Sequence, residues 1–375
     1  MKRVIVLGST GSIGTSALDI IHNNRDDFDL VAISANKNEK ELLKQAESFT
    51  VGNIALSGKT PESDKIRFYG ANSITRLIEE TDAHIVVNGI SGAVGMAPSV
   101  AALKSGKDLA LANKETMVMA GPLIKKIATQ NKTAILPVDS EHSALFYLLN
   151  GKEKEQIDEI IITASGGPFR GFSADQLKSV TKEQAMKHPT WDMGYKITID
   201  SASLANKGLE VIEAWRLFDI TLDKIKVLVH PQSYVHSIVR TADLAMYAQI
   251  SNPDMRLPIQ NALYYPRMKA VPSTFLDLAG KSLTFTEPDK ENFPMLPLAY
   301  QAADAGKSYP IVYNAVNEVA VQALVDGFIH FTEIPVITDK LLQRDWSDEA
   351  KSFKEVLDID STVRRITKEV IRRGK

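Results

Sequence analysis

Cysteine is missing from all 375 residues of the sequence. Without a thiol the chain forms no disulfide, offers no thiolate ligand to zinc and carries no thioester or thiohemiacetal intermediate. It also lacks an apolar run near the roughly 20 residues that a membrane span needs. Its first residues enter a strand, with neither the apolar segment of a signal peptide nor the composition of a transit peptide. These absences lead us to expect a cytoplasmic protein.

A strong charge of either sign is missing as well. The formal net charge is -2, with 24% charged and 44% hydrophobic residues. This balance gives no electrostatic reason to expect a nucleic acid or an anionic membrane as a partner. A globular chain of this length is expected to form two or three domains, each with its own core.

Strand and helix patterns alternate along the first 138 residues. Strands separated by helices of this length predict an α/β fold with a doubly wound parallel sheet. We therefore expect a Rossmann-like domain over residues 1–138. The expected strands are Arg3–Leu7, Leu30–Ser34, His84–Asn88, Asp108–Ala112 and Thr133–Pro137, and the expected helices are Thr15–Asn23, Glu39–Glu47 and Pro98–Ser105.

The pattern changes after residue 138. Residues 139–272 combine longer strands with helices and predict a central α/β domain whose sheet need not be parallel. Residues 273–297 are rich in Pro, Thr and charge and predict a connector, and residues 298–375 predict a helical domain. The expected strands are Ile157–Ala164, Ile225–Leu228 and Ala245–Ile250, one of which Ser237–Arg240 is expected to extend. The expected helices are Ala205–Phe218, Arg256–Tyr264, Leu298–Ala305, Ile311–Val325, Ile334–Leu342 and Val363–Arg372.

Three glycines, Gly8, Gly11 and Gly14, follow the first strand and open the first helix. In a βαβ unit this spacing permits a tight turn, a close approach of backbone to a pyrophosphate, and a helix N-terminus that faces the phosphates. The alternative is a glycine-rich turn without a ligand. The position at the first strand favours the dinucleotide site.

The end of the second strand indicates which dinucleotide binds. NAD sites usually place Asp or Glu about 20 residues after the glycines, where it holds the ribose hydroxyls. Here Ser34–Asn38 contains Lys37 and two Asn residues, and no acid occurs before Glu39. A 2'-phosphate would be repelled by a carboxylate and attracted by Lys37. The segment favours NADP.

Two polar triplets follow later strands of the same sheet. Asn113–Glu115 is expected near the nicotinamide, because ligands bind beyond the carboxyl ends of the strands; an ordinary polar turn is the alternative. Asp139–Glu141 offers two carboxylates that could share one hard cation. The same residues could instead cap a helix over Glu141–Leu149, and the two roles are compatible.

A third carboxylate, Glu210, lies in a segment that opens a helix from Ser201. Asn206, Lys207 and Glu210 fall on one face of that helix. A hydroxyl, an amide and an ammonium on the first turn would suit a phosphate, while Glu210 could complete an all-oxygen site for Mg²⁺ or Mn²⁺ rather than Zn²⁺. The alternative is a surface ion pair between Lys207 and Glu210.

Three further segments carry polar or aromatic side chains in turns. Ser165–Pro168 closes a strand and could present backbone amides to a substrate anion, or be a plain turn. His188–Gly194 holds Trp191 between Pro and Gly, as a water-excluding lid would or a buried loop anchor. His230 and His236 could suggest a metal pair, but the all-oxygen set competes with it and we favour a structural role.

In this order, the motifs resemble 1-deoxy-D-xylulose 5-phosphate reductoisomerases over essentially the whole chain. The resemblance implies an enzyme that uses NADPH and Mg²⁺ or Mn²⁺ to isomerise and reduce 1-deoxy-D-xylulose 5-phosphate to 2-C-methyl-D-erythritol 4-phosphate, on the non-mevalonate route to isoprenoid precursors. It also implies an NADP domain, a catalytic domain, a helical domain and usually a homodimer. Ala35-Asn36 departs from a frequent Ala-Gly, and Ser203-Leu204-Ala205 from a common Thr-Met-Met. The carrying segments are Gly8–Gly14, Asn113–Glu115, Asp139–Glu141, Ser165–Pro168, His188–Gly194, Asp200–Glu210 and His230–Ser237.

The resemblance also implies a role for individual residues. The NADPH contacts would be Thr10, Gly11, Ser12, Ile13, Lys37, Asn38, Asn113, Glu115 and Gly194. The metal ligands would be Asp139, Glu141 and Glu210. The substrate contacts would be Lys114, Ser140, Glu141, Ser165, His188, Ser201, Asn206, Lys207 and Glu210, with Trp191 and Met193 covering the site. The catalytic set would be Lys114, Asp139, Glu141, His188 and Glu210.

Two other functions are compatible with parts of the pattern. An NADP-dependent semialdehyde dehydrogenase or a related reductase of an amino-acid pathway is a second enzyme hypothesis. The phosphorylating type of semialdehyde dehydrogenase needs a nucleophilic cysteine, and the sequence has none. A non-enzymatic NADP sensor would need neither three carboxylates nor a phosphate-binding helix face. Oxidation of NADPH only in the presence of substrate and Mn²⁺ distinguishes the enzyme from the sensor.

Overall fold

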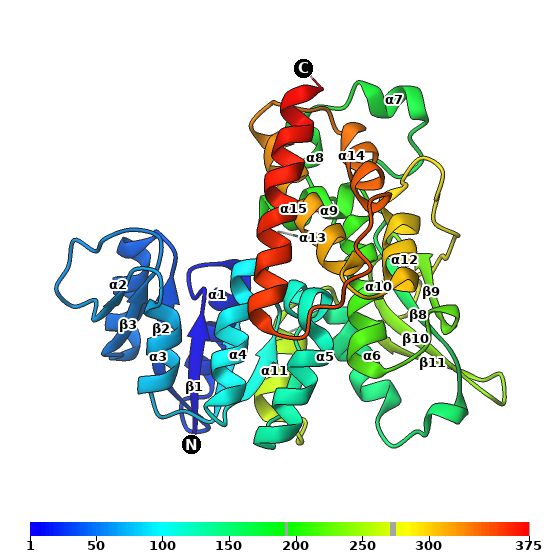
Figure 1. Cartoon of the computed structure of the whole chain (residues 1–375). Coiled ribbons are helices and arrows are strands. Elements are labelled where there is room, and N and C mark those ends of the chain that lie inside the picture. The colour runs from blue at the N-terminus through cyan, green and yellow to red at the C-terminus, as the bar shows by residue number, and fades with distance from the viewer. Residues whose placement is uncertain (192–193, 271–274, 375) are drawn as a thin grey trace. The chain divides into compact units, whose positions relative to one another are not determined.

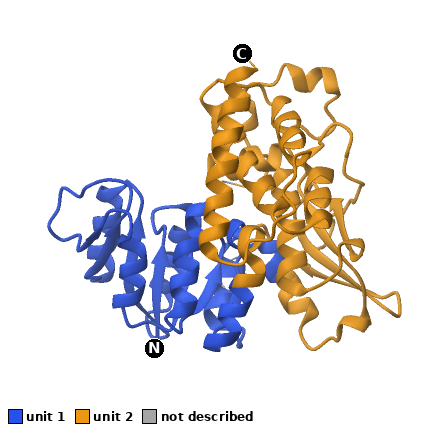
Figure 2. Ribbon diagram, in the orientation of Figure 1, with its two compact units in different colours: residues 1–116, 124–143, 254–273 blue, residues 117–123, 144–253, 274–375 orange. Residues whose placement is uncertain are grey.

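The computed structural model describes residues 1–191, 194–270 and 275–374. They form two compact units, coloured separately in Figure 2. Unit 1 comprises residues 1–116, 124–143 and 254–273, and unit 2 comprises residues 117–123, 144–253 and 274–375. The chain therefore passes between the units several times. None of the helices in the described ranges has the length and apolar character that a membrane span requires.

Unit 1 is built on a seven-stranded sheet in the order β4-β3-β2-β1-β5-β6-β7, with every pairing parallel. In the centre, Val4 lies between Leu30 and Ile85. These strands are nearly all apolar because helices cover both faces of a parallel sheet. The strands are β1 (Lys2–Leu7), β2 (Phe28–Ala35), β3 (Asn53–Leu56), β4 (Phe68–Tyr69), β5 (Ile85–Asn88), β6 (Asp108–Leu111) and β7 (Ile135–Pro137).

The predicted doubly wound parallel sheet is confirmed, and its strand order reverses between β1 and β5. A crevice for a dinucleotide is expected at that point, beyond the carboxyl ends of the strands. The helices of this unit are α1 (Ser12–Asn23), α2 (Glu39–Phe49), α3 (Ser73–Glu80), η1 (Ala93–Gly95), α4 (Met96–Lys104) and α11 (Arg256–Tyr264), while α5 (Lys114–Asn131) and α6 (Ser140–Leu149) each contribute residues to both units.

Unit 2 contains a four-stranded sheet in the order β11-β10-β8-β9. The strands β8 and β9 are parallel, and the other two pairings are antiparallel. The expectation of a second sheet that need not be parallel is thus confirmed. The strands are β8 (Ile157–Ala164), β9 (Ile225–Val229), β10 (Val235–Thr241) and β11 (Met246–Ile250), with η2 (Lys154–Gln156) and η3 (Leu222–Lys224) beside them.

The helices of unit 2 share one core with this sheet. Tyr313 is fully buried, and a Cβ placed on Gly208 would lie 2.6 Å from its hydroxyl oxygen. The C-terminal helices thereby fix the helix that carries Glu210. Figure 1 shows the last helix running beside α13. The helices are α7 (Ala174–Lys178), α8 (Lys182–Ala185), α9 (Tyr195–Ala202), α10 (Ala205–Phe218), α12 (Met295–Ala305), α13 (Tyr309–Val325), α14 (Glu333–Leu342) and α15 (Phe353–Arg373).

One local expectation was wrong: Ser201 does not open the helix that carries Glu210. Ser201 lies in the last turn of α9, and α10 begins after Leu204, whose φ of 61° is left-handed and breaks the helix. Ser203 bridges the break by accepting a hydrogen bond from the backbone N–H of Ala205 at 3.3 Å. Asn206 and Lys207 do occupy a first helical turn, as predicted.

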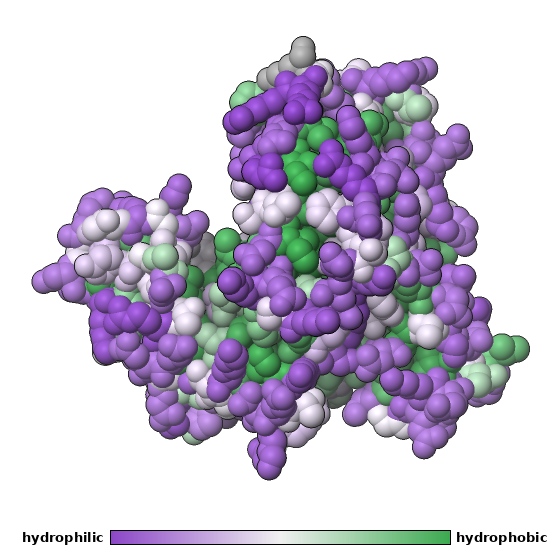
Figure 3. Space-filling model, in the orientation of Figure 1, coloured by the Kyte–Doolittle hydropathy of each residue, from purple (hydrophilic) through white to green (hydrophobic). Residues whose placement is uncertain are grey.

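The exposed surface in Figure 3 is mostly hydrophilic, with hydrophobic side chains in interrupted patches. Most of the apolar content is therefore inside the units. Buried polar groups are consequently the informative ones, and several of them surround the residues that the sequence singled out.

Candidate active site

The glycine-rich turn after β1 has the geometry of a phosphate-binding loop. Gly8 has a φ of 68°, and a Cβ on it would lie 3.1 Å from the carbonyl oxygen of Gly89. A Cβ on Gly14 would lie 2.3 Å from the carbonyl oxygen of Gly8, so side chains are excluded at both positions. Gly11 starts α1 without a side-chain cap. The first N–H groups of that helix are thus available to an anion such as a pyrophosphate.

Gln45 of α2 holds this loop through two hydrogen bonds, a role that was not predicted from the sequence. The buried Gln45 side chain accepts a hydrogen bond from the Ser9 hydroxyl at 2.7 Å and donates one to the Ser9 carbonyl at 3.1 Å. Gly8 and Ser9 are also tied to Ser34 of β2. A polar residue on the buried face of a helix was the only available signal. These contacts fix the shape of the loop.

The turn after β2 contains an acid, but that acid is engaged by neighbouring groups. Glu39 is buried and accepts hydrogen bonds from the backbone N–H groups of Glu62 at 2.8 Å and Ser63 at 2.9 Å. Its other oxygen lies 2.8 Å from the ammonium of Lys59. Lys37 and Asn38, the predicted 2'-phosphate contacts, line a hollow of about 480 Å³ here.

Asn113 and Glu115 hold the loop that follows β5. Asn113 caps α5 by accepting a hydrogen bond from the N–H of Thr116, and its amide donates to the carbonyls of Ile90 at 2.7 Å and Gly92 at 2.9 Å. Glu115 accepts from the N–H of Gly92 at 3.1 Å and from the amide of Asn113. Both side chains are buried. They fix the loop at the carboxyl end of β5, where the dinucleotide crevice is expected.

Lys114 and Asp139 form a buried ion pair 2.6 Å long between the ends of β6 and β7. Burial acts to raise the pKa of Asp139, but the charges of Lys114 and of His142, 3.8 Å away, hold that pKa well below its ordinary value. Ser140 donates a hydrogen bond to Glu141 at 2.7 Å. Unit 1 therefore presents an ionised carboxylate and a second carboxylate two residues later, a donor set that suits a hard cation.

In unit 2 the first turn of α10 gathers the predicted phosphate and metal residues. Lys207 forms an ion pair with Glu210, and the amide of Asn206 donates a hydrogen bond to the same carboxylate. Lys207 and Glu210 are buried, so this is not a surface ion pair. Asp139 and Glu141 belong to unit 1 and Glu210 to unit 2.

Ser201 lies beside the glycines of the predicted anion-binding turn. Gly167 has a φ of 66°, and a Cβ on it would lie 2.5 Å from the carbonyl oxygen of Ser201. The preceding residue, Asp200, is buried and pairs with Lys196 at 2.8 Å and with the amide of Asn317 at 2.8 Å. This network ties the end of α9 to α13. These contacts restrict the backbone at Ser165 and Ser201 and so fix the positions of their hydroxyls.

His188 is oriented by hydrogen bonds at both ring nitrogens. Its Nδ1 accepts from the N–H groups of Thr190 at 3.1 Å and Trp191 at 2.9 Å, so the proton of the neutral ring is on Nε2. Nε2 lies 2.9 Å from the Ser165 oxygen and donates to it. Burial and then the charge of Lys207 lower the pKa of His188 to about 4. Ser165 accepts from a neutral imidazole and keeps its own proton to donate.

The remaining residues of the predicted lid and histidine pair have simpler environments. Trp191 lies edge-on to His236, with ring centroids 6.3 Å apart. Met193 is outside the described residues, and Gly194 is exposed at the start of α9. His230 uses both nitrogens, towards the Thr284 carbonyl and the Tyr234 N–H, and stacks on Phe285. These contacts favour a structural role for His230.

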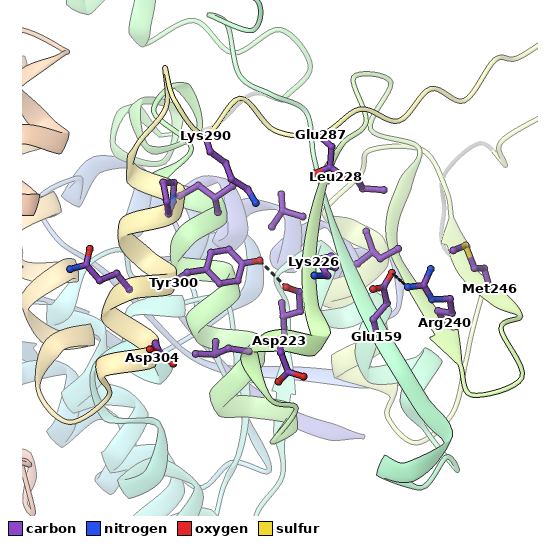
Figure 4. Close-up of a pocket in the computed structure, with 17 residues that line it drawn as sticks. Glu159, Asp223, Lys226, Leu228, Arg240, Met246, Glu287, Lys290, Tyr300 and Asp304 are labelled. Atoms are coloured by element: carbon purple, nitrogen blue, oxygen red, sulfur yellow. Dashed lines mark hydrogen bonds and ion pairs between the residues drawn. The ribbon is translucent and has the colours of Figure 1, made fainter.

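A larger hollow of about 920 Å³ lies in unit 2, over the four-stranded sheet. Figure 4 shows Tyr300, Lys226, Glu159 and Arg240 around it, with an ion pair of 2.7 Å between the last two. Its lining contains many apolar side chains and none of the residues that the sequence predicted for the site. Size therefore does not identify the reactive part of this molecule.

Three family models match successive parts of the chain. The model described as 1-deoxy-D-xylulose 5-phosphate reductoisomerase matches residues 4–121. The model of the 1-deoxy-D-xylulose 5-phosphate reductoisomerase C-terminal domain matches residues 135–218. The model of the DXP reductoisomerase C-terminal domain matches residues 250–366. Together they span both units.

Individual relatives are similar over nearly their whole length. The 1-deoxy-D-xylulose 5-phosphate reductoisomerase of Clostridium perfringens is 44% identical over 377 residues, covering 97% of this chain and 98% of that protein. A crystal structure of DOX-P reductoisomerase with NADPH, fosmidomycin and magnesium has a TM-score of 0.92 and 35% identity, covering 99% and 98%. The Zymomonas mobilis reductoisomerase with NADPH has a TM-score of 0.91 and 38% identity, covering 99% of both chains.

Proposed function

The chain belongs to the 1-deoxy-D-xylulose 5-phosphate reductoisomerase family, and from this premise we propose how its residues carry out the reaction. It converts 1-deoxy-D-xylulose 5-phosphate to 2-C-methyl-D-erythritol 4-phosphate with NADPH and a divalent metal ion, on the non-mevalonate route to isoprenoid precursors. The observation that carries this assignment is the identity of 44% over 97% of the chain. We propose an NADP-binding domain over residues 1–138, a catalytic domain over 139–272, a connector over 273–297 and a helical domain over 298–375.

NADPH binding is proposed for the carboxyl ends of the strands in unit 1. The loop that excludes side chains at Gly8 and Gly14 would hold the pyrophosphate, through Thr10, Gly11, Ser12 and Ile13. Lys37 and Asn38 would contact the 2'-phosphate, and Asn113, Glu115 and Gly194 would complete the cofactor contacts. The buried and engaged Glu39 supports NADPH over NADH, because its carboxylate is held away from a ribose by Lys59 and two N–H groups.

The metal site is proposed for Asp139, Glu141 and Glu210. Their oxygens suit Mg²⁺ or Mn²⁺, and the lowered pKa of Asp139 keeps that ligand ionised. When bound, such an ion acts as a Lewis acid that polarises the ketone and acidifies the neighbouring hydroxyl of the substrate. Asp139 and Glu210 would exchange their lysine partners for the ion. The ammonium groups of Lys114 and Lys207 would then bind anionic oxygens of the substrate.

The substrate phosphate is proposed to bind the first turn of α10 and the adjacent turns. Asn206 and Lys207 would donate from the helix, and Ser165 and Ser201 from the turns. Because His188 is neutral and donates to Ser165, it orients the Ser165 hydroxyl to donate its proton to a phosphate oxygen. His188 therefore acts here as a hydrogen-bond donor and not as a general base.

The bond changes follow from holding the ketone and the adjacent hydroxyl together. The bond between C3 and C4 of the substrate breaks, a bond between the former ketone carbon C2 and C4 forms, and C3 becomes an aldehyde. NADPH supplies the hydride that reduces this aldehyde, and one proton completes the alcohol. Lys114 and Ser140, at the ends of β6 and β7, are proposed to donate hydrogen bonds to the oxygens whose charge changes.

The segment from His188 to Gly194 is proposed as a lid. His188 accepts the backbone N–H groups of Thr190 and Trp191, so movement of this segment is coupled to the side chain that orients Ser165. Closure over bound substrate would exclude water while the aldehyde is present. Trp191 offers a fluorescence signal for this closure.

A homodimer in the cytoplasm is the proposed assembly and location. The edge strand β11 carries exposed apolar residues, with Met246 55% and Tyr247 47% exposed. An exposed apolar sheet edge is a surface that proteins usually cover. Sedimentation should give twice the mass of 41.3 kDa. Tyr247→Lys should shift the protein towards monomer, while Leu357→Lys, at an exposed apolar residue of α15, should not.

The function is tested by following NADPH absorbance with purified protein. Oxidation of NADPH should require both 1-deoxy-D-xylulose 5-phosphate and Mg²⁺ or Mn²⁺, and EDTA should stop it. Full activity after exhaustive chelation would contradict the metal site. Oxidation of NADPH without the sugar phosphate would contradict the substrate.

A further inference from the structure

A loop between β3 and β4 docks on the turn that is proposed to bind the 2'-phosphate. The N–H of Ser57 donates to the carbonyl of Ala35 at 3.1 Å, and the N–H of Gly58 donates to the carbonyl of Asn36 at 2.8 Å. A Cβ on Gly58 would lie 1.7 Å from the side-chain oxygen of Asn36. Asn36 and Gly58 therefore pack as a matched pair. The loop is fixed beside the end of β2.

The docked loop brings Lys59 to the same hollow as Lys37 of the turn and Lys40 of α2. Lys37, Lys40 and Lys59 all line this space of about 480 Å³, together with Glu39 and Glu62. Three positive and two negative groups leave one net positive charge. The Glu62 side chain is 86% exposed and can move out of the hollow into water. The remaining groups then carry a net charge of two positive units. A 2'-phosphate carries a charge of about -1.5 to -2 at neutral pH and would balance it.

Lys59 also pairs with Glu39, the buried acid among the residues that line this hollow. The Lys59 ammonium lowers the pKa of the Glu39 carboxyl, and the N–H groups of Ser63 and Glu62 lower it further against the effect of burial. Glu39 is thus a carboxylate at neutral pH, with its charge compensated by Lys59. An ammonium has three N–H donors, and two of those of Lys59 face Glu39 and Glu62. The third can serve a phosphate oxygen.

We propose that Lys59 is a determinant of NADPH specificity, which binds the 2'-phosphate and masks the Glu39 carboxylate. This inference rests on the proposed NADPH-dependent function, whose cofactor contacts it extends to a loop outside the glycine motif and the turn after β2. Loss of Lys59 removes one contact to the phosphate and exposes a carboxylate that repels it. The same carboxylate can then accept hydrogen bonds from the ribose hydroxyls, so the affinity for NADH should not fall.

The test measures nucleotide binding by calorimetry with the whole protein, without substrate or metal. The probes are 2',5'-ADP and 5'-AMP, which differ by the 2'-phosphate. Lys59→Gln should weaken 2',5'-ADP binding about tenfold or more, as expected for loss of one charge-assisted hydrogen bond, and leave 5'-AMP binding unchanged. Lys59→Arg should keep most of the affinity. Lys65→Gln, at an exposed lysine of the same loop, is the matched control and should bind like the native chain.

A double variant separates the two roles of Lys59. Glu39→Gln keeps an oxygen for the N–H groups of Glu62 and Ser63 but removes the charge. Adding it to Lys59→Gln should recover part of the lost 2',5'-ADP affinity. Equal weakening of both probes by Lys59→Gln, or affinities matching those of Lys65→Gln, would overturn the proposal. Native protein that does not distinguish the two probes would instead contradict the proposed use of NADPH.

Discussion

Each unit holds one buried carboxylate proposed for the metal, and each of these is paired with a lysine by different means. In unit 1, Lys114 and Asp139 come from the ends of two neighbouring strands, so the parallel sheet sets their distance. In unit 2, Lys207 and Glu210 are one helical turn apart on α10. The first pair depends on tertiary structure and the second on a local helix. The two lysine–carboxylate pairs therefore depend on different levels of structure, and mutations of the lysines can distinguish them.

Removal of the metal ligands should have the largest effect. Asp139→Asn and Glu210→Gln each remove one charged oxygen ligand, and we expect kcat/KM to fall by orders of magnitude at any Mg²⁺ concentration. Circular dichroism should show an intact fold. Glu155→Gln, at an exposed carboxylate, is the control and should behave like the native enzyme. Near-native activity of either variant would show that the substituted carboxylate does not bind the metal.

The paired lysines should differ in their effect on stability. Breaking a buried ion pair by removing one partner costs about 3–5 kcal/mol, so Lys114→Met and Lys207→Met should both lower the unfolding free energy in EDTA. Lys114→Met should cost more, because the pair it breaks links two strand ends, whereas α10 persists without Lys207. Mg²⁺ should restore stability, because it binds the folded carboxylates.

The surface pair of Lys178 and Asp175, 2.9 Å long, provides the control for these variants. Exposed ion pairs contribute about 0–1 kcal/mol, so Lys178→Met should leave urea unfolding nearly unchanged. If Lys207→Met destabilised the protein more than Lys114→Met, the distinction between a tertiary and a local pair would be wrong.

Acid should destabilise unit 2 through His236. Burial lowers the pKa of His236 to about 4, against the opposing effect of the carbonyls of Asn252 and Ser251. The unfolded chain binds this proton near pH 6.5 and the folded chain does not until about pH 4. Stability should therefore fall between pH 6.5 and 4, by on the order of 3 kcal/mol from this group. In urea unfolding, the unfolding free energy of His236→Gln should fall less between pH 6.5 and 4 than that of the native chain. An equal fall in both proteins would show that His236 is not the cause.

The lid should give the smallest signal. Substrate and NADPH together should change Trp191 fluorescence, and Trp191→Phe should abolish most of the change with little effect on stability. The other two tryptophans, Trp215 and Trp346, serve as internal references in unit 2. Trp191 fluorescence that does not change with saturating substrate and NADPH would argue against closure of the lid.

Several periodic segments were predictable from the sequence with the bounds that the structure has. The last helix, however, begins at Phe353 rather than at Val363, and the helix Lys114–Asn131 was not predicted. The strand Ile157–Ala164 and the helices Ala205–Phe218 and Arg256–Tyr264 were predicted with the bounds that the structure has. Their apolar patterns are long and end at clear turns. The strands β3 and β4 were not predicted because they have only four and two residues, too few for a pattern to develop.

Contacts between distant residues could not be predicted from one sequence. The helix break at Leu204 gave no signal, because leucine rarely adopts a left-handed conformation. Likewise, Gln45 and Ser9 are 36 residues apart, and nothing in either segment indicates their contact. Motifs and the family resemblance predict which residues form the site, but not how those residues are oriented. The hydrogen bonds that orient them became visible only in the folded chain.

The most direct test of the account is the carbon skeleton of the product. The substrate, labelled with ¹³C at C3 and C4, is incubated with the enzyme, NADPH and Mg²⁺, and the product is examined by ¹³C NMR. We predict that the one-bond coupling between the labels disappears, because the bond between C3 and C4 breaks, and that one NADPH is consumed per 2-C-methyl-D-erythritol 4-phosphate. A product that keeps this coupling in an unbranched polyol phosphate would mean simple ketone reduction and would contradict the account.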